Sequence, residues 1–307
     1  MTVVVFGSLN MDLVVRSARL PVPGETLSGQ KFETIAGGKG ANQAVAVARQ
    51  QVPTVMVGCV GADSYGQALR QALAHEGVTV DGVNSDPAAT TGIAAITVAD
   101  SGANQIIVVP GANGQVGLPE LDYLKGQLPS AQYLLLQLEI PLSTVTTAAQ
   151  LAHAAGIQVI LDPAPAPTVD LRSLYSHIDI LTPNQVEAAQ LVGFPVETIA
   201  QAREAIAVLR QQGVPTVIIK LGEQGILCGS EQEQIVQVPA LPVSAVDTVA
   251  AGDAFNGGLA VALQAGNSLT EALHWASATA AWSVTQPGAQ SSLPTRSQVT
   301  GLINNLT

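Results

Sequence analysis

Short, wholly apolar runs that end in glycine or polar residues recur along this chain. Residues 3–6 and 54–60 are the first two such runs, and each is followed by glycine. Further runs occupy residues 134–136, 159–161, 180–181 and 217–219. Apolar runs of this length without alternation are typical of strands buried on both faces of a parallel sheet. They predict the strands of one central sheet.

Apolar residues at helical spacing fill the segments between these runs. Ala202, Ile206 and Leu209 are one example. Two more helices are expected after the helix that begins near Asp253, with residues 286–292 between them. Strands that alternate with helices predict an α/β fold with a mainly parallel central sheet and helices on both faces.

Two parts of the chain depart from this alternation. Residues 13–35 are extended, contain prolines and show no helical pattern. The β-rich runs 92–98 and 105–109 are joined by a glycine-containing turn, which predicts a hairpin. Residues 225–228 and 232–238 predict a second antiparallel pair. We expect an α/β domain of residues 1–12, 37–91 and 112–307 and a small β-sheet lid of residues 13–36 and 92–111.

Composition narrows the class of protein. The chain has 307 residues, which is enough for a sizeable core, and its net charge is −11. Such an acidic balance argues against non-specific binding to nucleic acid or to an anionic membrane. Cys59 and Cys228 lie far apart in apolar runs, so we expect reduced, buried thiols. Residues 3–6 are too short a run for a signal peptide, and a cytoplasmic protein without a membrane span is expected.

The residues 247–258, DTVAAGDAFNGG, carry the strongest chemical signal. Ala250, Ala251 and Gly252 are small, and an apolar helical pattern follows them, which predicts a tight turn into a helix N-terminus. Unpaired backbone N–H groups at such a terminus suit an anion such as phosphate. Asp253 would stand beside that anion and could act as a general base. An acid in the first turn also suits any stable helix, so this stretch alone leaves a structural role open.

Other polar residues follow the predicted strands. Asn10 and Asp12 come soon after the first strand, where open α/β sheets bind ligands, although an ordinary Asx turn would look the same. Residues 37–42 form a glycine loop that opens a helix, but no Ser or Thr follows Lys39, so the loop is not a Walker A motif. The later strands are followed by Glu139, Asp162, Asn184 and Lys220.

The stretch 247–258 resembles the C-terminal signature D-T-x-x-A-G-D-x-F-x-G of the ribokinase-like (PfkB) carbohydrate kinases. Six further stretches resemble motifs of that family, occur in the family's order and span nearly the whole chain. They are residues 7–12, 23–26, 37–44, 61–66, 137–139 and 182–187.

The resemblance implies transfer of the γ-phosphate of ATP to the 5-hydroxyl of D-ribose. It assigns Asp253 as the general base and Ala250, Ala251 and Gly252 as the anion hole. By the same motifs, the sugar would be held by Asn10, Met11, Asp12, Gly38, Lys39, Gly40, Ala41, Asn42, Glu139 and Asp253. A neutral polyol needs many short polar groups, which agrees with the amides and carboxylates in this set.

The resemblance also implies an ATP site and two kinds of metal ion. ATP would contact Asn184, Glu187, Lys220, Leu221, Gly222, Glu223, Gln224, Gly225, Gly252, Asp253 and, with no motif to anchor it, Ser277. Asn184 and Glu187 resemble an N-x-x-E motif that the family uses around Mg²⁺ and the phosphates; an N-capped helix is the alternative. A K⁺ ion would lie among Asp247, Val249, Ser283, Gln286, Gly288 and Ser292, mostly through carbonyl oxygens.

Some alternatives stay open at this point. The family often carries Thr at the position of Ala254, and a glycine more often stands within Ala250-Ala251. Related kinases share this framework, so deoxyribose, fructose, a nucleoside or a sugar phosphate could be the acceptor. A catalytically silent sugar-binding regulator is a different reading, whereas a Rossmann dehydrogenase would need G-x-G-x-x-G after the first strand. The resemblance further implies a homodimer formed through the lid.

Overall fold

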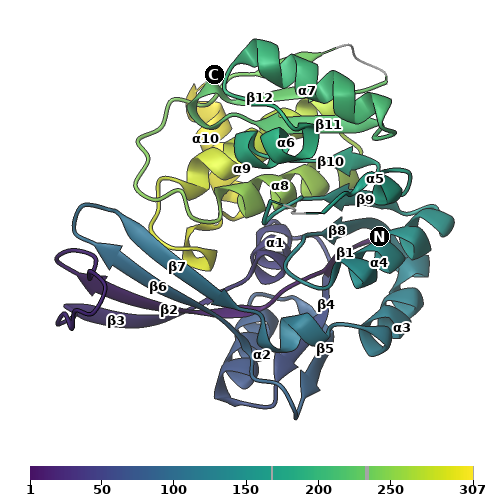
Figure 1. Ribbon diagram of the computed structural model, residues 1–307. Helices are drawn as coiled ribbons and strands as arrows, with labels where there is room; N and C mark the ends of the chain where they lie inside the picture. Colours follow the sequence, from purple (N-terminus) through teal and green to yellow (C-terminus); the bar gives the residue numbers. More distant parts are fainter. Residues whose placement is uncertain (167–168, 232–234, 307) are drawn as a thin grey trace.

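Nine strands form the main sheet of the computed structural model, which describes residues 1–166, 169–231 and 235–306 (Figure 1). Their order is β13-β12-β11-β10-β9-β8-β1-β4-β5. β12 and β13 are antiparallel to their neighbours, and the other pairings are parallel. The strands are β1 (Thr2–Phe6), β4 (Thr54–Gly61), β5 (Thr79–Asp86), β8 (Ala131–Leu136), β9 (Gln158–Leu161), β10 (Ile180–Leu181), β11 (Thr216–Lys220), β12 (Ile226–Gly229) and β13 (Val236–Val238).

Helices cover both faces of this sheet, as the alternation of strands and helices predicts. Successive residues of a strand point to opposite faces, so Val4 and Phe6 pack under one helical layer and Val3 and Val5 under the other. The first layer contains α3 (Leu118–Gln127), α4 (Leu142–Ala154), α5 (Arg172–Tyr175), α6 (Gln185–Val192) and α7 (Ile199–Gln211). The second contains α1 (Lys39–Ala48), α2 (Ser64–His75), α8 (Ala251–Gln264) and α9 (Leu269–Ser283), with α10 (Arg296–Leu306) packed on α9.

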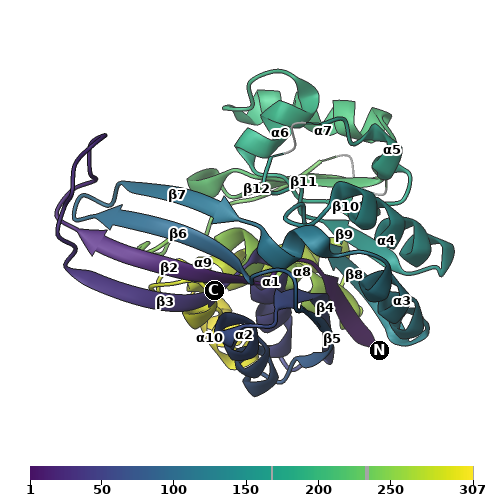
Figure 2. The ribbon, with the colours of Figure 1, turned by 60° about the horizontal axis from the view of Figure 1, so that its bottom comes forward.

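A second sheet projects from this body (Figures 1 and 2). Its order is β3-β2-β6-β7, and the predicted hairpin forms its outer part. The strands are β2 (Asn10–Ser17), β3 (Lys31–Gly37), β6 (Gly92–Ala99) and β7 (Asn104–Val109). β2 begins at Asn10, which pairs with Gly37 on one side and Gly92 on the other. Asn10 and Asp12 therefore lie in a strand and not in an Asx turn.

Other details of the strands differ from the sequence prediction or extend it. β5 escaped prediction because polar residues such as Asp81 and Asn84 interrupt its apolar pattern at the edge of the sheet. The pairing of β12 with β13 confirms the predicted antiparallel pair, although residues 232–234 lie outside the described part of the chain. Across the described ranges, no helix is both long and apolar enough to cross a membrane.

Candidate active site

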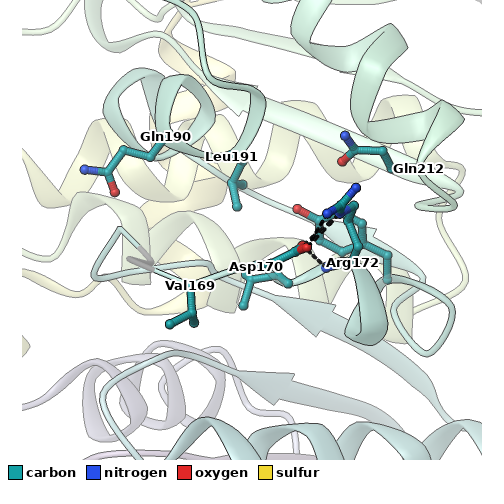
Figure 3. A pocket seen from close by; sticks show the side chains of 8 residues that line it. Val169, Asp170, Arg172, Gln190, Leu191 and Gln212 are labelled. Carbon is teal, nitrogen blue, oxygen red and sulfur yellow. Dashed lines mark hydrogen bonds and ion pairs between the residues drawn. The ribbon is translucent and has the colours of Figure 1, made fainter.

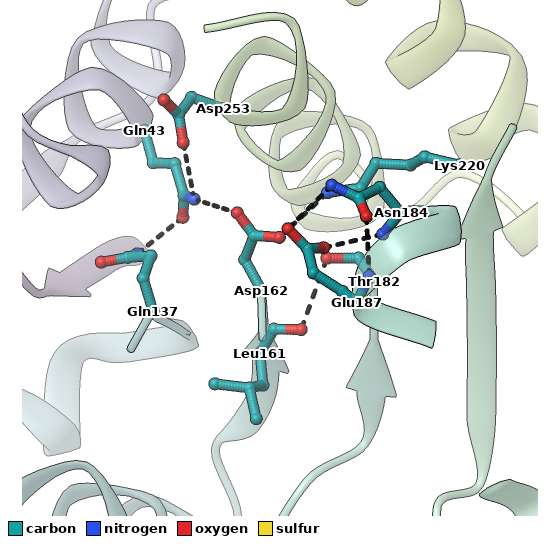
Figure 4. Close-up of polar contacts among 9 residues, drawn as sticks. All are labelled: Gln43, Gln137, Leu161, Asp162, Thr182, Asn184, Glu187, Lys220 and Asp253. Carbon is teal, nitrogen blue, oxygen red and sulfur yellow. Dashed lines mark hydrogen bonds and ion pairs between the residues drawn. The ribbon is translucent and has the colours of Figure 1, made fainter. Parts of the chain in front are cut away.

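The polar residues that follow the parallel strands meet at one edge of the main sheet (Figure 4). Parallel strands run in one direction, so their carboxyl ends share an edge. Asp162 follows β9, Asn184 follows β10, and Lys220 ends β11. A cavity of about 440 Å³ lies at this edge and continues to the start of α8. Its lining includes Lys39, Asp162, Asn184, Glu187, Lys220, Gly222, Ala250, Ala251, Gly252 and Asp253.

The turn that begins α8 has the geometry expected of an anion site. Ala250 is the N-cap and adopts a left-handed conformation with φ of 60°, which a residue with a Cβ rarely takes. α8 then begins at Ala251, whose N–H donates to Thr248 O at 3.3 Å, and the N–H groups of Gly252 and Asp253 that follow have no preceding helical turn to bond to. Backbone strain of this kind is concentrated at functional sites, where it fixes a required geometry. The turn can therefore offer N–H groups to an anion in the cavity.

Asp253 lies in the first turn of α8 and is only 3% exposed. Oδ2 accepts a hydrogen bond of 2.9 Å from Asn42 Nδ2, and Oδ1 accepts one of 3.1 Å from Gln43 Nε2. Burial raises the pKa of Asp253 to about 6, while Lys39 and the two amides oppose this rise and Asp162 adds to it. The carboxyl is thus a buried hydrogen-bond acceptor whose pKa is suited to proton transfer near neutral pH.

Lys39 and Asp253 are the predicted sugar contacts in the lining of this cavity, and the remaining ones lie outside the lining, in the adjoining hydrogen-bond network or in the core. Ser8 Oγ donates a hydrogen bond of 2.5 Å to Glu139 Oε2, and Lys39 N donates to the same oxygen at 3.1 Å. Asn10 Oδ1 accepts a bond of 2.7 Å from Asn113 Nδ2. These bonds hold Glu139 and Asn10 near the start of α1. The side chains of Met11 and Ala41 instead pack in the core beneath the site.

Three residues of this group show how closely the backbone and the charges are arranged. Gly38 has φ of 89°, and a Cβ there would lie 2.6 Å from Asn10 N, so only glycine fits. Gly40 N lies 3.4 Å from Ser8 Oγ. Burial, with the carboxylates of Glu139 and Asp253, raises the pKa of Asp12 to about 7. The predicted sugar contacts therefore bring carboxyl groups close together.

Lys39 supplies the opposite charge. Its side chain lines the cavity, and the residue is half-buried. Burial lowers the pKa of Lys39, but carboxylates on four different elements outweigh burial and raise it above its ordinary value. These carboxylates belong to Asp253, Asp162, Glu139 and Glu187.

Asn184 and Glu187 form a capping box at the start of α6, as the structural alternative predicted. Glu187 N donates to Asn184 Oδ1 at 2.9 Å, and Asn184 N donates to Glu187 Oε2 at 2.7 Å. Both residues nevertheless line the cavity. Burial and the nearby Asp162 raise the pKa of Glu187. The cap fixes two oxygen-bearing side chains beside Lys220, where a hydrated cation with a nucleotide could be held.

The predicted nucleotide loop follows β11 and contains a short 3₁₀ helix, η3 (Gly222–Gln224). Leu221 is buried, whereas Glu223 and Gln224 are exposed on the loop. Gly225 has φ of 83°, and a Cβ there would lie 2.1 Å from Val238 O. Of this loop, Lys220 and Gly222 line the cavity. Ser277 lies in α9 and is not among the cavity-lining residues.

The predicted K⁺ positions lie on two loops that Asp247 joins. Its Oδ1 accepts a bond of 3.0 Å from Val249 N, and its Oδ2 accepts one of 2.9 Å from Gly288 N. The hydroxyls of Ser283 and Ser292 donate to carbonyl oxygens of their own helices, and the side chain of Gln286 is exposed. No cluster of three or more His, Cys, Asp or Glu side chains suited to a metal occurs in the described ranges.

Several residues of the site were not among the predicted contacts, and Gln43, Gln137, Asp162 and Asn113 are four of them. Gln43 bonds to Asp253 and accepts a bond of 2.7 Å from Gln137 Nε2. Asp162 accepts bonds from Lys220 and Gln43, and Asn113 positions Asn10. The sequence did contain a signal for Asp162, which follows a strand like the predicted residues. Gln43 and Gln137 lie inside motifs that were quoted for their neighbours.

A second cavity of about 360 Å³ lies between α5, α6 and the end of α7 (Figure 3). Its lining includes Leu191, Gln212 and the pair formed by Arg172 and Asp170. The guanidinium of Arg172 is therefore already bound to a carboxylate. None of the predicted site residues lines this cavity.

Comparison with known proteins identifies the family of the chain. The sequence matches the pfkB family carbohydrate kinase over residues 1–296. It is 41% identical over 297 residues to a ribokinase from Haemophilus influenzae, covering 97% of this chain and 96% of that one. A deoxyribokinase from Salmonella typhimurium is 36% identical over 298 residues, with 97% of both chains covered. The structure of Arabidopsis thaliana ribokinase complexed with ribose and ATP superimposes with a TM-score of 0.91 at 38% identity, covering 98% of each chain.

Proposed function

The chain belongs to the pfkB family of carbohydrate kinases, and from this premise we propose that it transfers the γ-phosphate of ATP to the 5-hydroxyl of D-ribose. The products would be ribose 5-phosphate and ADP. One observation carries the proposal: buried Asp253 lies at the anion turn, in a cavity that is also lined by Lys39 from the predicted sugar contacts and by Asn184, Glu187 and Lys220 from the predicted ATP contacts. The ribose and ATP bound to the Arabidopsis relative support the choice of both substrates.

Sugar binding would use the short polar groups around the start of α1. Glu139 and Asn10 are held by other residues and have further lone pairs for sugar hydroxyls. Asp12 would accept a sugar hydroxyl at the base of the second sheet. Because these groups are fixed before the sugar arrives, little side-chain entropy is lost on binding.

In the proposed transfer, Asp253 accepts the proton of the 5-hydroxyl as the oxygen attacks the γ-phosphorus. A bond forms between that oxygen and phosphorus, and the bond from phosphorus to the bridging oxygen of ADP breaks. Backbone N–H groups of the turn 250–253 stabilise the charge on the phosphoryl oxygens. Lys39 and Lys220 line the same cavity and add positive charge.

The residues present fit both implied metal ions. Asn184 and Glu187 would hold Mg²⁺, with its bound waters, beside the phosphates, because their oxygens border the nucleotide side of the cavity. Mg²⁺ neutralises phosphate charge when it is bound. The loops joined by Asp247 would hold K⁺ through carbonyl oxygens, next to the turn that starts α8.

The second sheet would act as a lid and as a dimer surface. β2 carries Asn10 and Asp12 directly from the site into this sheet, so closure of the sheet over the sugar would exclude water that could accept the phosphate. The outer strand β7 is exposed along its whole length and includes Ile107, which is 69% exposed. An apolar edge strand of this kind is suited to association with a second copy.

Deoxyribose is the second candidate acceptor, because one similar protein is a deoxyribokinase. A coupled assay of ADP release would test both sugars, with fructose and a nucleoside as further acceptors, in the presence of Mg²⁺ with and without K⁺. Turnover highest on ribose supports the proposal. Turnover highest on deoxyribose would make deoxyribose the acceptor and leave the proposed phosphoryl transfer unchanged. Sugar binding without turnover on any acceptor would overturn the proposal in favour of a silent regulator.

A further inference from the structure

A bridge of hydrogen bonds joins the candidate base to a second buried carboxylate (Figure 4). Gln43 Nε2 lies 3.1 Å from Asp253 Oδ1 and 3.3 Å from Asp162 Oδ2. One side-chain amide nitrogen with two hydrogens thus donates to both carboxylates. Asp162 comes from β9, Gln43 from α1 and Asp253 from α8, so the bridge crosses from the sheet edge to the second helical layer.

The orientation of the Gln43 amide is fixed by its own oxygen. Gln43 Oε1 accepts a bond of 2.7 Å from Gln137 Nε2, and Gln43 is buried. If the amide were reversed, its oxygen would face two carboxylates and its nitrogen would face another donor. Gln43 therefore presents its N–H groups to Asp162 and Asp253 whatever the cavity contains.

The other oxygen of Asp162 binds the ammonium group of a lysine that lines the cavity. Asp162 Oδ1 accepts a bond of 2.9 Å from Lys220 Nζ. A Cβ placed on Gly252 would lie 3.3 Å from the same Nζ, so the ammonium stands beside the turn that starts α8. Asp162 is 2% exposed, and each of its two oxygens accepts a bond from one of these donors. Lys220 is thereby held where a transferring phosphoryl group would meet the anion turn.

We propose that Asp162 is a positioning residue for phosphoryl transfer, which orients Asp253 through Gln43 and holds Lys220 at the anion turn. This inference rests on the proposed function of Asp253 as the base. A carboxylate at this position has two effects that an amide cannot reproduce together. It accepts from both donors at once, and its negative charge makes the nearby base harder to ionise.

The charged groups around Asp253 come from several elements, and each affects its ionisation. Burial raises the pKa of Asp253, Lys39 opposes that rise and Asp162 adds to it. Asp12 on β2 also interacts with Asp253. The remaining charges near this network are Lys220 on β11, Glu187 on α6 and Glu139 after β8. Asp162 is distinguished from the other carboxylates because it shares a hydrogen-bond donor with the base.

The substitution Asp162→Asn tests the charge and the geometry together. It removes the like charge, so the acidic limb of the kcat/KM profile should shift to lower pH by about one unit. Only one oxygen remains to accept from Lys220 or Gln43, so kcat should fall about tenfold or more at the plateau. Asp162→Glu keeps the charge but displaces the carboxylate. It should lower kcat while leaving the acidic limb where it is in the wild type.

Asp179→Asn is the matched control. Asp179 directly precedes β10, whereas the site residues follow the carboxyl ends of the strands. It accepts a bond of 2.7 Å from Val159 N, which an Asn oxygen can also accept. This variant should retain the wild-type pH profile. Thermal melting and sugar binding measured by calorimetry would show whether each variant is folded.

The outcomes separate this inference from the proposed function. A shift of the acidic limb to lower pH in Asp162→Asn, but not in Asp162→Glu or Asp179→Asn, supports the inference. If folded Asp162→Asn has the wild-type limb and plateau, Asp162 is not a positioning residue, although Asp253 can still be the base. If the wild-type enzyme phosphorylates a sugar but its pH profile has no acidic limb that depends on Asp253, then Asp253 is not the base. The inference about Asp162 is then also wrong.

Discussion

Asn42 donates a hydrogen bond of 2.9 Å from Nδ2 to Oδ2 of Asp253, and the two residues are 211 positions apart in the chain. The bond joins the first turn of α1, which the sugar-side glycine loop opens, to the first turn of α8, which the anion turn opens. Asn42 Oδ1 has no hydrogen-bond partner within the described residues. The Asn42 amide can therefore rotate, unlike that of Gln43, whose oxygen is held by Gln137.

This difference predicts that Asp253→Asn remains folded but loses activity. The new amide can direct its oxygen to Gln43 and its nitrogen to the rotated Asn42 oxygen, so both contacts survive. Without a carboxylate to accept the hydroxyl proton, kcat should fall by about 10²–10⁴-fold while sugar affinity changes little. Steady-state kinetics and calorimetric titration with ribose would measure the two effects. Unchanged turnover would remove Asp253 from the role of base.

The pH dependence of the reaction should follow Asp253. Its pKa is raised to about 6, and the ionised form is the active one, so kcat/KM should rise with pH through about 6 and then level off. Lys39 lowers the pKa of Asp253, so Lys39→Met should move this limb to higher pH. A pH profile of each enzyme at saturating ATP would measure the shift. A Lys39→Met limb at lower pH than in the wild type would contradict this electrostatic account.

We expect ionisation of Asp12 to lower the stability of the fold, although we propose that this side chain binds the sugar. Its pKa is about 7 in the native protein, against an ordinary 3.8, so between these values the native state holds more protons than the unfolded state. The free energy of unfolding contributed by Asp12 therefore falls as pH rises through that window. Asp12→Asn cannot ionise and should be more stable than the wild type at about pH 8, by on the order of 1–2 kcal/mol.

The stability advantage of Asp12→Asn should shrink as the pH falls toward 3.8, because below that value the wild-type carboxyl is mostly protonated in both states. Denaturant unfolding at several pH values would measure this trend, and the affinity for ribose should fall at the same time. An advantage that is equal at all pH values would mean that packing, and not ionisation, explains it.

The sequence predicted those parts of the site that depend on local chemistry. Small residues before Asp253 predicted the turn, and polar residues after apolar strands predicted one common edge, because both depend on residues close together in the chain. The parallel sheet then brings the strand ends together without further information. The strand β5 was missed because its edge position tolerates polar residues such as Asp81.

The network around the base could not be predicted in this way. Gln43 contacts Asp253 and Asp162 only because α1 packs against α8 and both lie over the end of β9. An amide within a helix has no pattern in sequence that distinguishes a bridging role from a solvated one. An Asx turn at Asn10 likewise stayed open in the sequence, because its pairing partners, Gly37 and Gly92, lie far along the chain.

Asp247→Asn should weaken the response to K⁺. Both oxygens of Asp247 accept backbone N–H bonds, from Val249 and Gly288, and an Asn side chain can satisfy only one of these donors. The two loops should then separate and lose the shared arrangement of carbonyl oxygens. When turnover is measured against K⁺ concentration, the apparent affinity for K⁺ should be lower by about tenfold or more. Asp122→Asn, on the surface of α3, is the matched control and should respond as the wild type does.

Ile107 provides the test of association through the second sheet. It lies on the edge strand β7 and is 69% exposed, and its apolar neighbours on that strand are also exposed. A lysine in the middle of an apolar contact would be buried without a partner, so Ile107→Lys should convert a dimer to monomers. Sedimentation velocity over a range of protein concentrations would measure this change. Gln105→Lys, near the polar end of the same strand, is the control and should remain dimeric, and a wild type that is monomeric at all concentrations would refute the proposed interface.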